Sequence, residues 1–360
     1  MRITFLLPSY GWKPAGGLRV AYEYANGLVA RGHEVAMVHP RRGADAPLPP
    51  TGSLSRRLQW EAARFRDRAF RPSVNWQHID GRVRMLYVLD LDASRVPDAD
   101  VVVATAFQTA EYAIGYPASK GAKFYLIQHY ETWAGPKDRV DATWRAPLHK
   151  VVISRWLLEI GRELGCERIE CIPNGLDHKK YGLLTPISTR PERVATLLHA
   201  DNWKGSADAL EALGLARKHH PELQVALFGT PPRWLSVPEW VEYFRNPPQK
   251  KLVNQIYNGS SIYLCASWAE GFALPPAEAM ACGCAVASTD CGGVREFAEH
   301  EVTALLSPPR DPQSLARNVL RLVDDDELRQ KLARAGRDRI EGFTWERSTD
   351  RLERLFKKIL

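Results

Sequence analysis

Long hydrophobic runs are missing from this 360-residue sequence. No segment approaches the roughly 18 consecutive apolar residues of a membrane-spanning helix, which excludes an integral membrane protein. The first residues, Met1–Pro8, carry one positive charge and a short apolar stretch. This pattern is typical of a first β-strand and not of a signal peptide, so we expect the chain to stay in the cytoplasm.

Several motifs of metal and cofactor chemistry are also missing. The six cysteines form no CxxC pair and have no paired His motif, so we expect reduced core residues and no structural zinc. The sequence has no GxGxxG, which argues against a nicotinamide-binding domain. It also has no DxD motif to hold Mg²⁺, because Asp324–Asp326 lies between expected helices, where such residues cap helix starts.

Positive charge is concentrated in the first half. Residues 1–180 contain 26 Lys and Arg against 19 Asp and Glu, whereas residues 181–360 contain 23 of each. A basic half indicates an acidic partner, such as an anionic lipid or an acidic substrate, unless it is simply a solvated surface. Nucleic acid is not expected as a partner, because no motif combines basic and stacking residues.

Apolar segments of strand length alternate with amphipathic helical segments along the whole chain. Such alternation predicts parallel sheets covered by helices on both faces. A prior of about 150 residues per domain indicates two such domains. The expected strands are Ile3–Pro8, Glu34–His39, Val101–Thr105, Lys123–Gln128, Lys150–Ser154, Val194–His199, Gln224–Phe228, Ile262–Ala266, Ala285–Ser288 and Thr303–Leu306. The expected helices are Leu18–Ala30, Ser206–His219, Leu252–Asn258, Pro275–Ala281, Ser314–Leu322, Glu327–Ile340 and Thr344–Leu360.

Pro, Gly and Asn cluster over Pro173–Pro191, which predicts the linker between the domains. We therefore place the boundary between an N-terminal and a C-terminal domain at about residues 175–176. Ligands bind at the carboxyl ends of parallel strands, so two such domains facing each other would form a deep cleft.

The segment from Glu270 to Gly283 follows an expected strand and carries the clearest chemistry. Gly271 allows close approach of a ligand, and Pro275 suits the first turn of a helix whose free N–H groups attract phosphate. Glu270 and Glu278 flank that start. Carboxylates beside a phosphate site suit the hydroxyl groups of a sugar and a ribose, so the segment predicts a pocket for a nucleotide joined to a sugar.

This segment, EGFALPPAEAMACG, resembles the E-x7-E signature of glycosyltransferase family 4, retaining enzymes with the GT-B fold. Four further segments resemble motifs of this family in the same order, and the resemblance covers most of the chain. They are Arg31–Val35 (RGHEV), Ile172–Asp177 (IPNGLD), Cys291–Glu296 (CGGVRE) and Phe343–Glu346 (FTWE). The resemblance implies two Rossmann-like domains, with the C-terminal helix returning to the N-terminal domain. Residues 1–175 plus 344–360 would form the N-terminal, acceptor-side domain, and residues 176–343 the C-terminal, nucleotide-sugar-binding domain.

The resemblance also implies roles for individual residues. Glu270 would hold hydroxyls of the donor sugar, Glu278 those of the ribose, and Lys204 the diphosphate, whose charge grows as the glycosidic bond breaks. Gly16 and Gly17 would reach the donor phosphates through their backbone, and His129 would lie near the reacting sugar. The catalytic residues implied are His129, Glu270 and Lys204. The donor-binding residues implied are Gly16, Gly17, Lys204, Glu270, Gly271, Phe272, Ala273, Leu274 and Glu278, with no metal ligand.

Two positions depart from the family pattern. Leu198 stands where an Arg six residues before the Lys is usual, so the second positive charge on the diphosphate is missing or comes from another residue such as His199. Ala273 stands where Gly is usual, and Ala fits unless the loop needs a positive φ there.

The implied function is retaining transfer of a hexosyl or deoxyhexosyl group from a nucleoside-diphosphate sugar to a hydroxyl of a glycan, lipid-linked or small-molecule acceptor. The family route is a metal-independent front-face reaction, without a permanently bound cofactor. The stretch Gln128–Glu131 (QHYE) resembles a QDYE stretch of some bacterial polysaccharide glycosyltransferases. The donor base and sugar depend on loops around Gly229–Trp240. Two alternatives remain open: a hydrolysing nucleotide-sugar epimerase of the same fold, and a non-catalytic nucleotide-sugar-binding protein.

Apolar residues recur at helical spacing within Ser53–Pro72, and the remaining faces carry six Arg against two acidic residues. Basic amphipathic helices of this kind lie on anionic membrane surfaces. This segment therefore makes the inner face of the membrane a second expected location. The alternative is a helix that packs its apolar face on its own domain.

Overall fold

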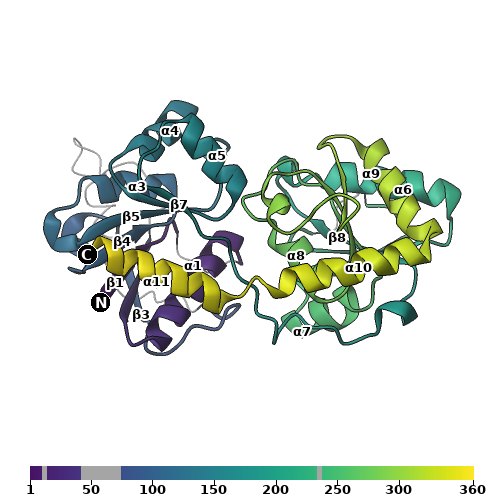
Figure 1. Ribbon diagram of the computed structural model, residues 1–360, viewed down its shortest axis with the longest axis horizontal. Helices are drawn as coiled ribbons and strands as arrows, with labels where there is room; N and C mark the ends of the chain where they lie inside the picture. Colours follow the sequence, from purple (N-terminus) through teal and green to yellow (C-terminus); the bar gives the residue numbers. More distant parts are fainter. Residues whose placement is uncertain (10–13, 42–73, 233–236) are drawn as a thin grey trace, which may run out of the picture. The chain divides into compact units, whose positions relative to one another are not determined.

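The computed structural model describes residues 1–9, 14–41, 74–232 and 237–360, which form two compact α/β units (Figure 1). The N-terminal unit comprises Met1–Ile153, Leu157–Asn174 and Trp345–Leu360, and the C-terminal unit comprises Ser154–Trp156 and Gly175–Thr344. The basic segment Ser53–Pro72 lies outside the described residues. Within the described ranges, every helix is too short or too polar to cross a membrane.

The N-terminal unit is built on a parallel sheet with the strand order β3-β2-β1-β4-β5-β6-β7. Its central strands are continuous buried apolar runs, as expected for a sheet that is covered on both faces. The strands are β1 (Arg2–Leu6), β2 (Glu34–Pro40), β3 (Arg84–Val88), β4 (Val101–Ala104), β5 (Ala122–Ile127), β6 (His149–Val152) and β7 (Ile169–Cys171).

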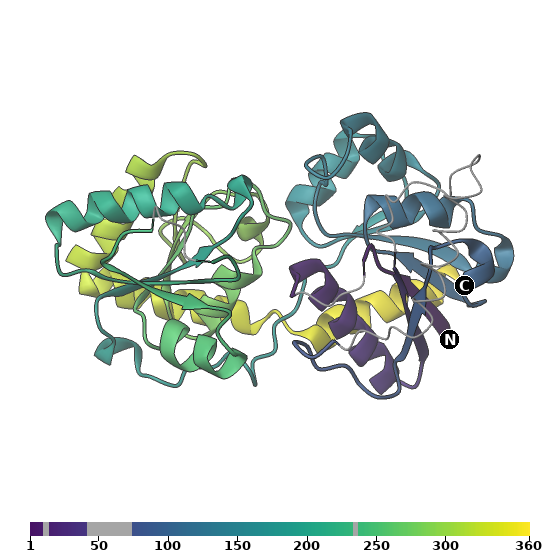
Figure 2. The same cartoon turned by 180° about the vertical axis from the view of Figure 1, so that it is seen from behind.

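Helices cover both faces of this sheet. The helices are α1 (Gly16–Ala30), α3 (Phe107–Ile114), α4 (Lys137–Arg145), α5 (Arg155–Glu163) and α11 (Trp345–Ile359), with short turns η1 (Ala93–Arg95) and η2 (Ala118–Lys120). Helices α1 and α11 lie side by side on one face, and α3 and α4 lie on the other (Figures 1 and 2). Phe356 of α11 packs on Phe124 of β5, with ring centroids 4.7 Å apart. The C-terminal helix thus completes the N-terminal unit, as predicted.

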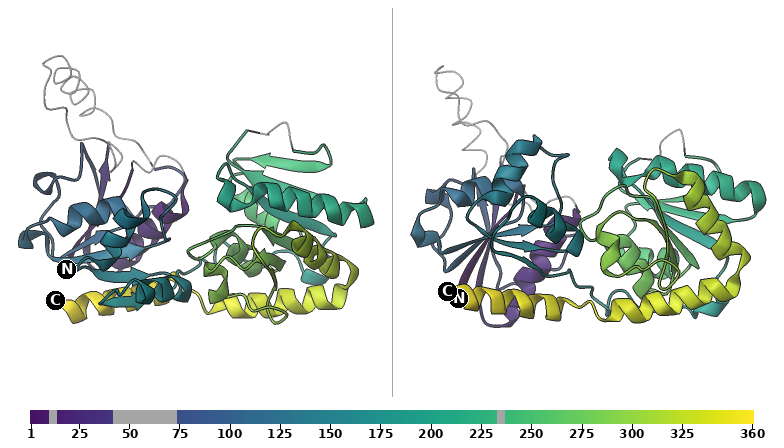
Figure 3. Two further views of the ribbon diagram at one scale, coloured as in Figure 1. Left: turned by 90° about the horizontal axis from the view of Figure 1, so that it is seen from above. Right: turned by 45° about the horizontal axis from the view of Figure 1, so that its top comes forward.

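The C-terminal unit has a second parallel sheet, with the order β10-β9-β8-β11-β12-β13. Its strands are β8 (Arg193–Leu198), β9 (Gln224–Gly229), β10 (Val241–Arg245), β11 (Ile262–Cys265), β12 (Ala285–Thr289) and β13 (Leu305–Ser307). Helices α6 and α9 pack on one face around a shared apolar core, and α8 packs against β11 and β12 from the other face (Figure 3).

The helices of this unit are α6 (Ser206–His219), α7 (Gln249–Lys251), α8 (Leu274–Ala281), α9 (Pro312–Asp324) and α10 (Asp326–Glu341). The short turns are η3 (Ile187–Thr189), η4 (Asn202–Lys204), the π-helical turn η5 (Leu252–Tyr257) and η6 (Gly293–Glu296). Asp325 caps α10 by accepting the backbone N–H of Leu328 at 2.9 Å. The capping role expected for the Asp324–Asp326 cluster is confirmed.

The predicted fold class, two doubly wound Rossmann-like α/β domains, is confirmed. Three strands were missed: β3, β7 and β10. Each lies at an edge of its sheet, where one flank has no neighbouring strand. β7 and β10 mix polar and apolar residues, so they lack the continuous apolar pattern that identified the central strands. β3 is apolar after Arg84, but its residues are only partly buried or exposed.

The predicted linker Pro173–Pro191 is too long. The chain joins the C-terminal unit already at Gly175. Arg190 is buried and donates to the carbonyl oxygen of Ser260 at 3.1 Å and to the side-chain oxygen of Asn258 at 3.0 Å. A buried guanidinium needs several such acceptors, and these contacts fix this polar segment to the unit.

Gly27 allows the close contact between α1 and α11. A Cβ atom at this position would lie 2.6 Å from the Oγ1 atom and 2.9 Å from the Cγ2 atom of Thr349. Thr349 is fully buried, and its β-branched side chain has little freedom to turn away. Gly214, inside α6, has nothing within 4 Å of the same added atom.

We therefore expect opposite effects from the same substitution. Gly27→Ala should lower the free energy of unfolding by about 1–3 kcal/mol through overpacking. Gly214→Ala should raise it by about 0.5–1 kcal/mol, because Ala is the better helix former. Thermal unfolding followed by circular dichroism measures both. Adding Thr349→Ala should recover most of the loss at Gly27, and a Gly27→Ala protein as stable as Gly214→Ala would contradict the close contact.

Candidate active site

Lys204 and Glu270 form an ion pair at the carboxyl edge of the C-terminal sheet. Lys204 ends the turn after β8, and Glu270 lies in the loop after β11. The Lys204 Nζ atom lies 2.8 and 2.9 Å from the two carboxylate oxygens of Glu270, and the Ser267 hydroxyl donates to Oε1 at 2.8 Å. The side chains are only 17% and 11% exposed. The structure therefore joins two predicted catalytic residues that are 66 positions apart in the sequence.

Gly205 makes this approach possible. Its φ of +66° lies in the left-handed region, and a Cβ atom there would lie 1.9 Å from the carbonyl oxygen of Ala266. Only glycine combines that conformation with such close contact to the end of β11. The Lys-Gly pair in the sequence is thus a structural requirement of the ion pair.

The loop from Glu270 to Leu274 is anchored from both sides. Glu270 donates its backbone N–H to Cys291 at 2.8 Å, and Gly293 donates to the Glu270 carbonyl at 2.9 Å. The Phe272 ring is buried against Phe297, with centroids 5.4 Å apart. Phe272 can therefore meet a ligand only through its backbone. Because residues 275 and 276 are both proline, the N–H groups at the start of α8 come from Gly271, Phe272, Ala273 and Leu274.

Ala273 has a positive φ, the one conformation in which an alanine was not expected to fit. It has φ +67° and ψ +66° and stands at the N-cap of α8. An alanine in the left-handed region costs about 1–2 kcal/mol because its Cβ crowds the carbonyl oxygen. The expectation that Ala fits here is thus corrected: the loop does need a positive φ, and Ala273 is strained.

Glu278 lies in α8 and is only 4% exposed. Its Oε2 atom accepts a hydrogen bond from the hydroxyl of Tyr257 at 2.9 Å. Burial, with contributions from the carboxylates of Glu278 and Glu270, raises the pKa of Tyr263 well above its usual range. Tyr263 lines the same hollow as Lys204 and Glu270, and its ring centroid lies 5.9 Å from that of Tyr257, the partner of Glu278.

Leu198 and His199 are the two positions considered for the second positive charge. Leu198, in the position of the usual Arg, is fully buried. Burial lowers the pKa of His199, although Asp201 opposes the shift. The Nδ1 atom of His199 accepts the backbone N–H of Asp201 at 3.2 Å, which also favours the neutral ring. A neutral imidazole adds no full charge to a phosphate site at pH 7.

Two cations instead lie on two tryptophan rings of this unit. Lys204 Nζ is 4.1 Å from the ring centroid of Trp203, and the guanidinium of Arg310 is 4.1 Å from that of Trp268. The backbone N–H of Trp268 donates to the Trp203 carbonyl at 2.7 Å, which ties the two pairs together. Such cation–π contacts restrain long side chains. Of these four residues, only Lys204 was predicted as a site residue.

The N-terminal unit places Gly17 beside the end of β5. Gly16 and Gly17 start α1, whose N-cap has no side-chain hydrogen bond. The side-chain amide of Gln128 donates to the Gly17 carbonyl at 3.1 Å, and His129 is the next residue. The predicted residues Gly16, Gly17 and His129 thus gather within this unit.

The imidazole of His129 is oriented by its backbone surroundings. Its Nδ1 atom lies 3.1 Å from the carbonyl oxygen of Tyr130, which makes Nδ1 a donor. Its ring also meets the exposed Trp133 edge-on. Glu131, two residues further along, has a structural role, because it accepts the backbone N–H of Phe107 at 2.8 Å at the start of α3.

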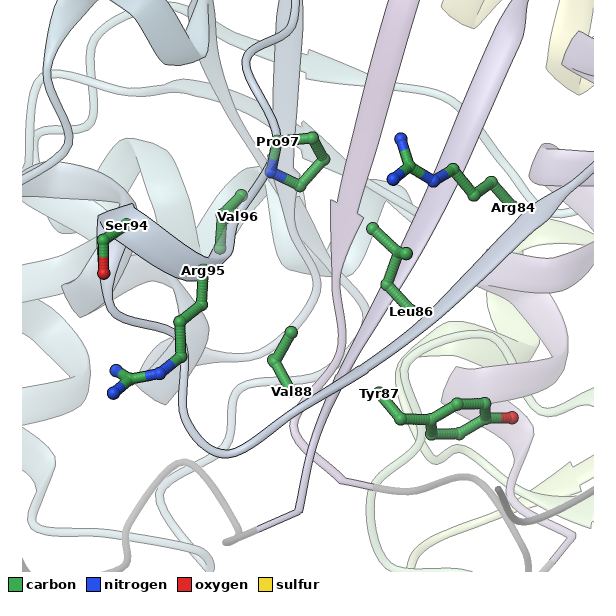
Figure 4. A pocket seen from close by; sticks show the side chains of 8 residues that line it. All are labelled: Arg84, Leu86, Tyr87, Val88, Ser94, Arg95, Val96 and Pro97. Atoms are coloured by element: carbon green, nitrogen blue, oxygen red, sulfur yellow. The ribbon is translucent and has the colours of Figure 1, made fainter. Parts of the chain in front are cut away.

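Another hollow of the described residues lies away from these side chains. A cavity of about 240 Å³ opens against the edge strand β3, between the guanidinium groups of Arg84 and Arg95 (Figure 4). None of the predicted site residues lines it. A hollow of about 10 Å³ lies at Lys204, Ser267 and Glu270, where the ion pair takes up the space. In the described part of the chain, no three His, Cys, Asp or Glu side chains gather as metal ligands would.

The strain at Ala273 can be tested with a matched pair of substitutions. Ala273→Gly should leave the free energy of unfolding unchanged or raise it by up to about 1 kcal/mol, because glycine tolerates positive φ. Ala277→Gly, inside the same helix and fully buried, should lower it by about 1 kcal/mol or more. Chemical denaturation measures both. Equal losses for the two variants would show that Ala273 is not strained.

Comparisons with known proteins show what this chain is similar to. Residues 185–339 match the family model described as "Glycosyl transferases group 1". A D-inositol 3-phosphate glycosyltransferase of Saccharomonospora viridis is 33% identical over 116 residues, a match that covers 32% of this chain and only 27% of that protein. A glycogen synthase of Mycobacterium tuberculosis is 25% identical over 390 residues, covering 96% of this chain and 92% of that protein.

The fold is shared over the full length. The structure of Anabaena HepE in complex with UDP-glucose has a TM-score of 0.73 and 15% sequence identity, covering 99% of this chain and 100% of that one. At this identity the likeness concerns the fold alone. Residues 185–339, within the C-terminal unit, are therefore similar to the Glycosyl transferases group 1 family, and the chain as a whole shares the GT-B fold.

Proposed function

We propose that this protein is a glycosyltransferase that moves a sugar from a nucleoside-diphosphate sugar to a hydroxyl group of an acceptor. The observation that carries the proposal is the cluster of Lys204, Glu270 and Glu278 with the backbone N–H groups of the loop between the two carboxylates. One cation, two hydroxyl acceptors and several N–H donors match the parts of a nucleotide sugar. Nearly all of this cluster is buried, which strengthens each interaction with a charged ligand.

In this proposal Lys204 turns from Glu270 to the diphosphate. The ion pair keeps both charges compensated while the pocket is empty, since an unpaired buried charge is strongly unfavourable. A donor offers the ammonium a diphosphate and offers Glu270 the hydroxyls of its sugar. The exchange replaces one set of charged contacts by another, and Lys204 then stabilises the charge that develops on the leaving group.

The remaining residues complete the donor site. Glu278 accepts the ribose hydroxyls, and the N–H groups of Gly271, Phe272, Ala273 and Leu274 donate to the diphosphate and the sugar. In the N-terminal unit, the proposal gives Gly16 and Gly17 a role in binding the donor phosphates. His129, with Nδ1 held by a carbonyl, is assigned to the reacting sugar.

The proposed reaction retains the configuration of the sugar and needs no metal. The bond between the anomeric carbon and the phosphate oxygen breaks, and its electron pair stays on the diphosphate. The acceptor oxygen attacks from the same face, and its proton passes to the leaving phosphate oxygen. The protein supplies mainly orientation and charge stabilisation. The acceptor is a glycan, a lipid-linked glycan or a small molecule, met in the cytoplasm or at the inner face of the membrane.

Binding of a donor nucleotide is the first test. A panel of nucleoside diphosphates and nucleotide sugars is added during thermal unfolding, headed by UDP and UDP-glucose, because a protein of the same fold binds UDP-glucose. A ligand at about 100 times its dissociation constant should stabilise the protein by about 2.7 kcal/mol. Glu278→Ala and Lys204→Ala should reduce the shift, whereas Glu327→Ala, at an exposed glutamate of α10, should not. If no nucleotide changes the unfolding temperature, the donor site is wrongly assigned.

Metal dependence and reaction class can be examined with the same ligand. We expect the stabilisation to persist in excess EDTA, because Lys204 and backbone N–H groups carry the phosphate contacts. Loss in EDTA with recovery in Mg²⁺ would show that a metal is required. Incubation of the donor without acceptor, followed by NMR, should give no epimerised nucleotide sugar. Epimer formation would identify an epimerase instead.

A further inference from the structure

Tyr257 is the polar contact of Glu278 that no sequence motif indicated. It is the last residue of the π-helical turn Leu252–Tyr257, and its ring is fully buried. Phe228 and Tyr263 pack around it, with ring centroids 5.7 and 5.9 Å away. Its hydroxyl donates to Oε2 of Glu278 at 2.9 Å. One buried side chain thus holds an oxygen of the carboxylate assigned to the ribose.

The wide helical turn directs this hydroxyl. The backbone N–H of Asn258 donates to the Val253 carbonyl, five residues back, at 2.9 Å. The extra residue in the turn changes the direction of the side chains that follow, a device often found at functional sites. The Asn258 side chain also donates to the Gly182 carbonyl at 3.0 Å. The turn is therefore fixed both by its own backbone and by the segment next to it.

In the hydrogen bond between Tyr257 and Glu278, the phenol is always the donor. Burial, with the adjacent Glu278 carboxylate, raises the pKa of Tyr257 well above its usual range, so the phenol keeps its proton. A protonated phenol donates to a carboxylate, and an ionised carboxylate can only accept. The bond to Oε2 therefore restricts rotation of the carboxylate and sets the directions in which it can accept further hydrogen bonds.

We propose that Tyr257 is a positioning residue for donor binding: its hydroxyl orients Glu278 to accept the ribose hydroxyls, so this pair makes the pocket discriminate ribose from 3′-deoxyribose. The inference rests on the proposed function, because it requires Glu278 to contact a nucleotide. It adds a residue and a source of selectivity within the donor site. Tyr257 itself does not touch the reacting atoms.

The test compares two ligands in four proteins. The ligands are UDP and 3′-deoxy-UDP, or the same pair with whichever base binds in the panel above. Calorimetry gives their dissociation constants for the wild type, Tyr257→Phe, Glu278→Gln and the double variant. A hydrogen bond to a charged group corresponds to about 10- to 150-fold in affinity, so the wild type should prefer UDP by at least tenfold.

Tyr257→Phe keeps the ring and removes only the donor. We expect UDP to bind about tenfold more weakly and 3′-deoxy-UDP to change less than threefold, so the preference for ribose shrinks. The double variant should then lose no more than Glu278→Gln alone, because the two residues act as one unit. Tyr181→Phe is the control: this ring is buried beside Tyr257, but its hydroxyl contacts Gln249. The Tyr181→Phe protein should prefer UDP over 3′-deoxy-UDP as strongly as the wild type does.

The outcomes separate the two proposals. If Tyr257→Phe weakens both ligands equally, Tyr257 only supports the fold and the positioning role is overturned. If the wild type binds both ligands equally, Glu278 does not read the ribose, and the inference fails while the donor site stands. If the wild type binds no nucleoside diphosphate, the proposed function itself fails and the positioning role falls with it.

Discussion

The buried ion pair between Lys204 and Glu270 is the interaction around which the C-terminal unit's candidate site is arranged. Removing one partner of such a pair leaves an uncompensated charge, at a typical cost of about 3–5 kcal/mol. Ser267 adds a hydrogen bond to the carboxylate, and the Trp203 ring lies against the ammonium. The ends of β8 and β11 are thereby joined through charge. The Lys204 ammonium and the Glu270 carboxylate are also the groups proposed to bind a phosphate and a sugar. The atoms that stabilise the protein without ligand are therefore the atoms proposed to bind the donor.

This arrangement depends on backbone conformations that are unusual for the residues concerned. Gly205 lies against the end of β11 where a side chain cannot fit, and Ala273 adopts a left-handed conformation at the start of α8. A π-helical turn carries Tyr257. Such features are maintained when surrounding contacts over-determine them, and they concentrate at functional sites. Their gathering around two carboxylates and one lysine therefore supports a binding role for this edge of the sheet.

Sequence and structure agree best where burial is complete. The central strands of both sheets are continuous apolar runs, and their positions were predicted to within one or two residues. The edge strands β3, β7 and β10 were missed: an edge is partly solvated, and β7 and β10 have mixed polar and apolar sequences. The linker was predicted too long for a related reason. Its composition is that of a loop, but the buried Arg190 attaches it to the C-terminal unit through contacts with residues about 70 positions away.

The sequence by itself determined the fold class and the order of the central strands along the chain, and its resemblance to a known family singled out Lys204, Glu270 and Glu278 as candidate ligand-binding residues. Periodicity, turn residues and motif spacing are local properties, so they can be recognised in the sequence without knowledge of tertiary contacts. Only the tertiary structure decided that Lys204 and Glu270 pair, that burial lowers the pKa of His199, that Ala273 has a positive φ and that Tyr257 donates to Glu278. Each of these depends on burial or on contacts between distant segments. Burial and contact arise only when the chain is packed, and local sequence does not encode them.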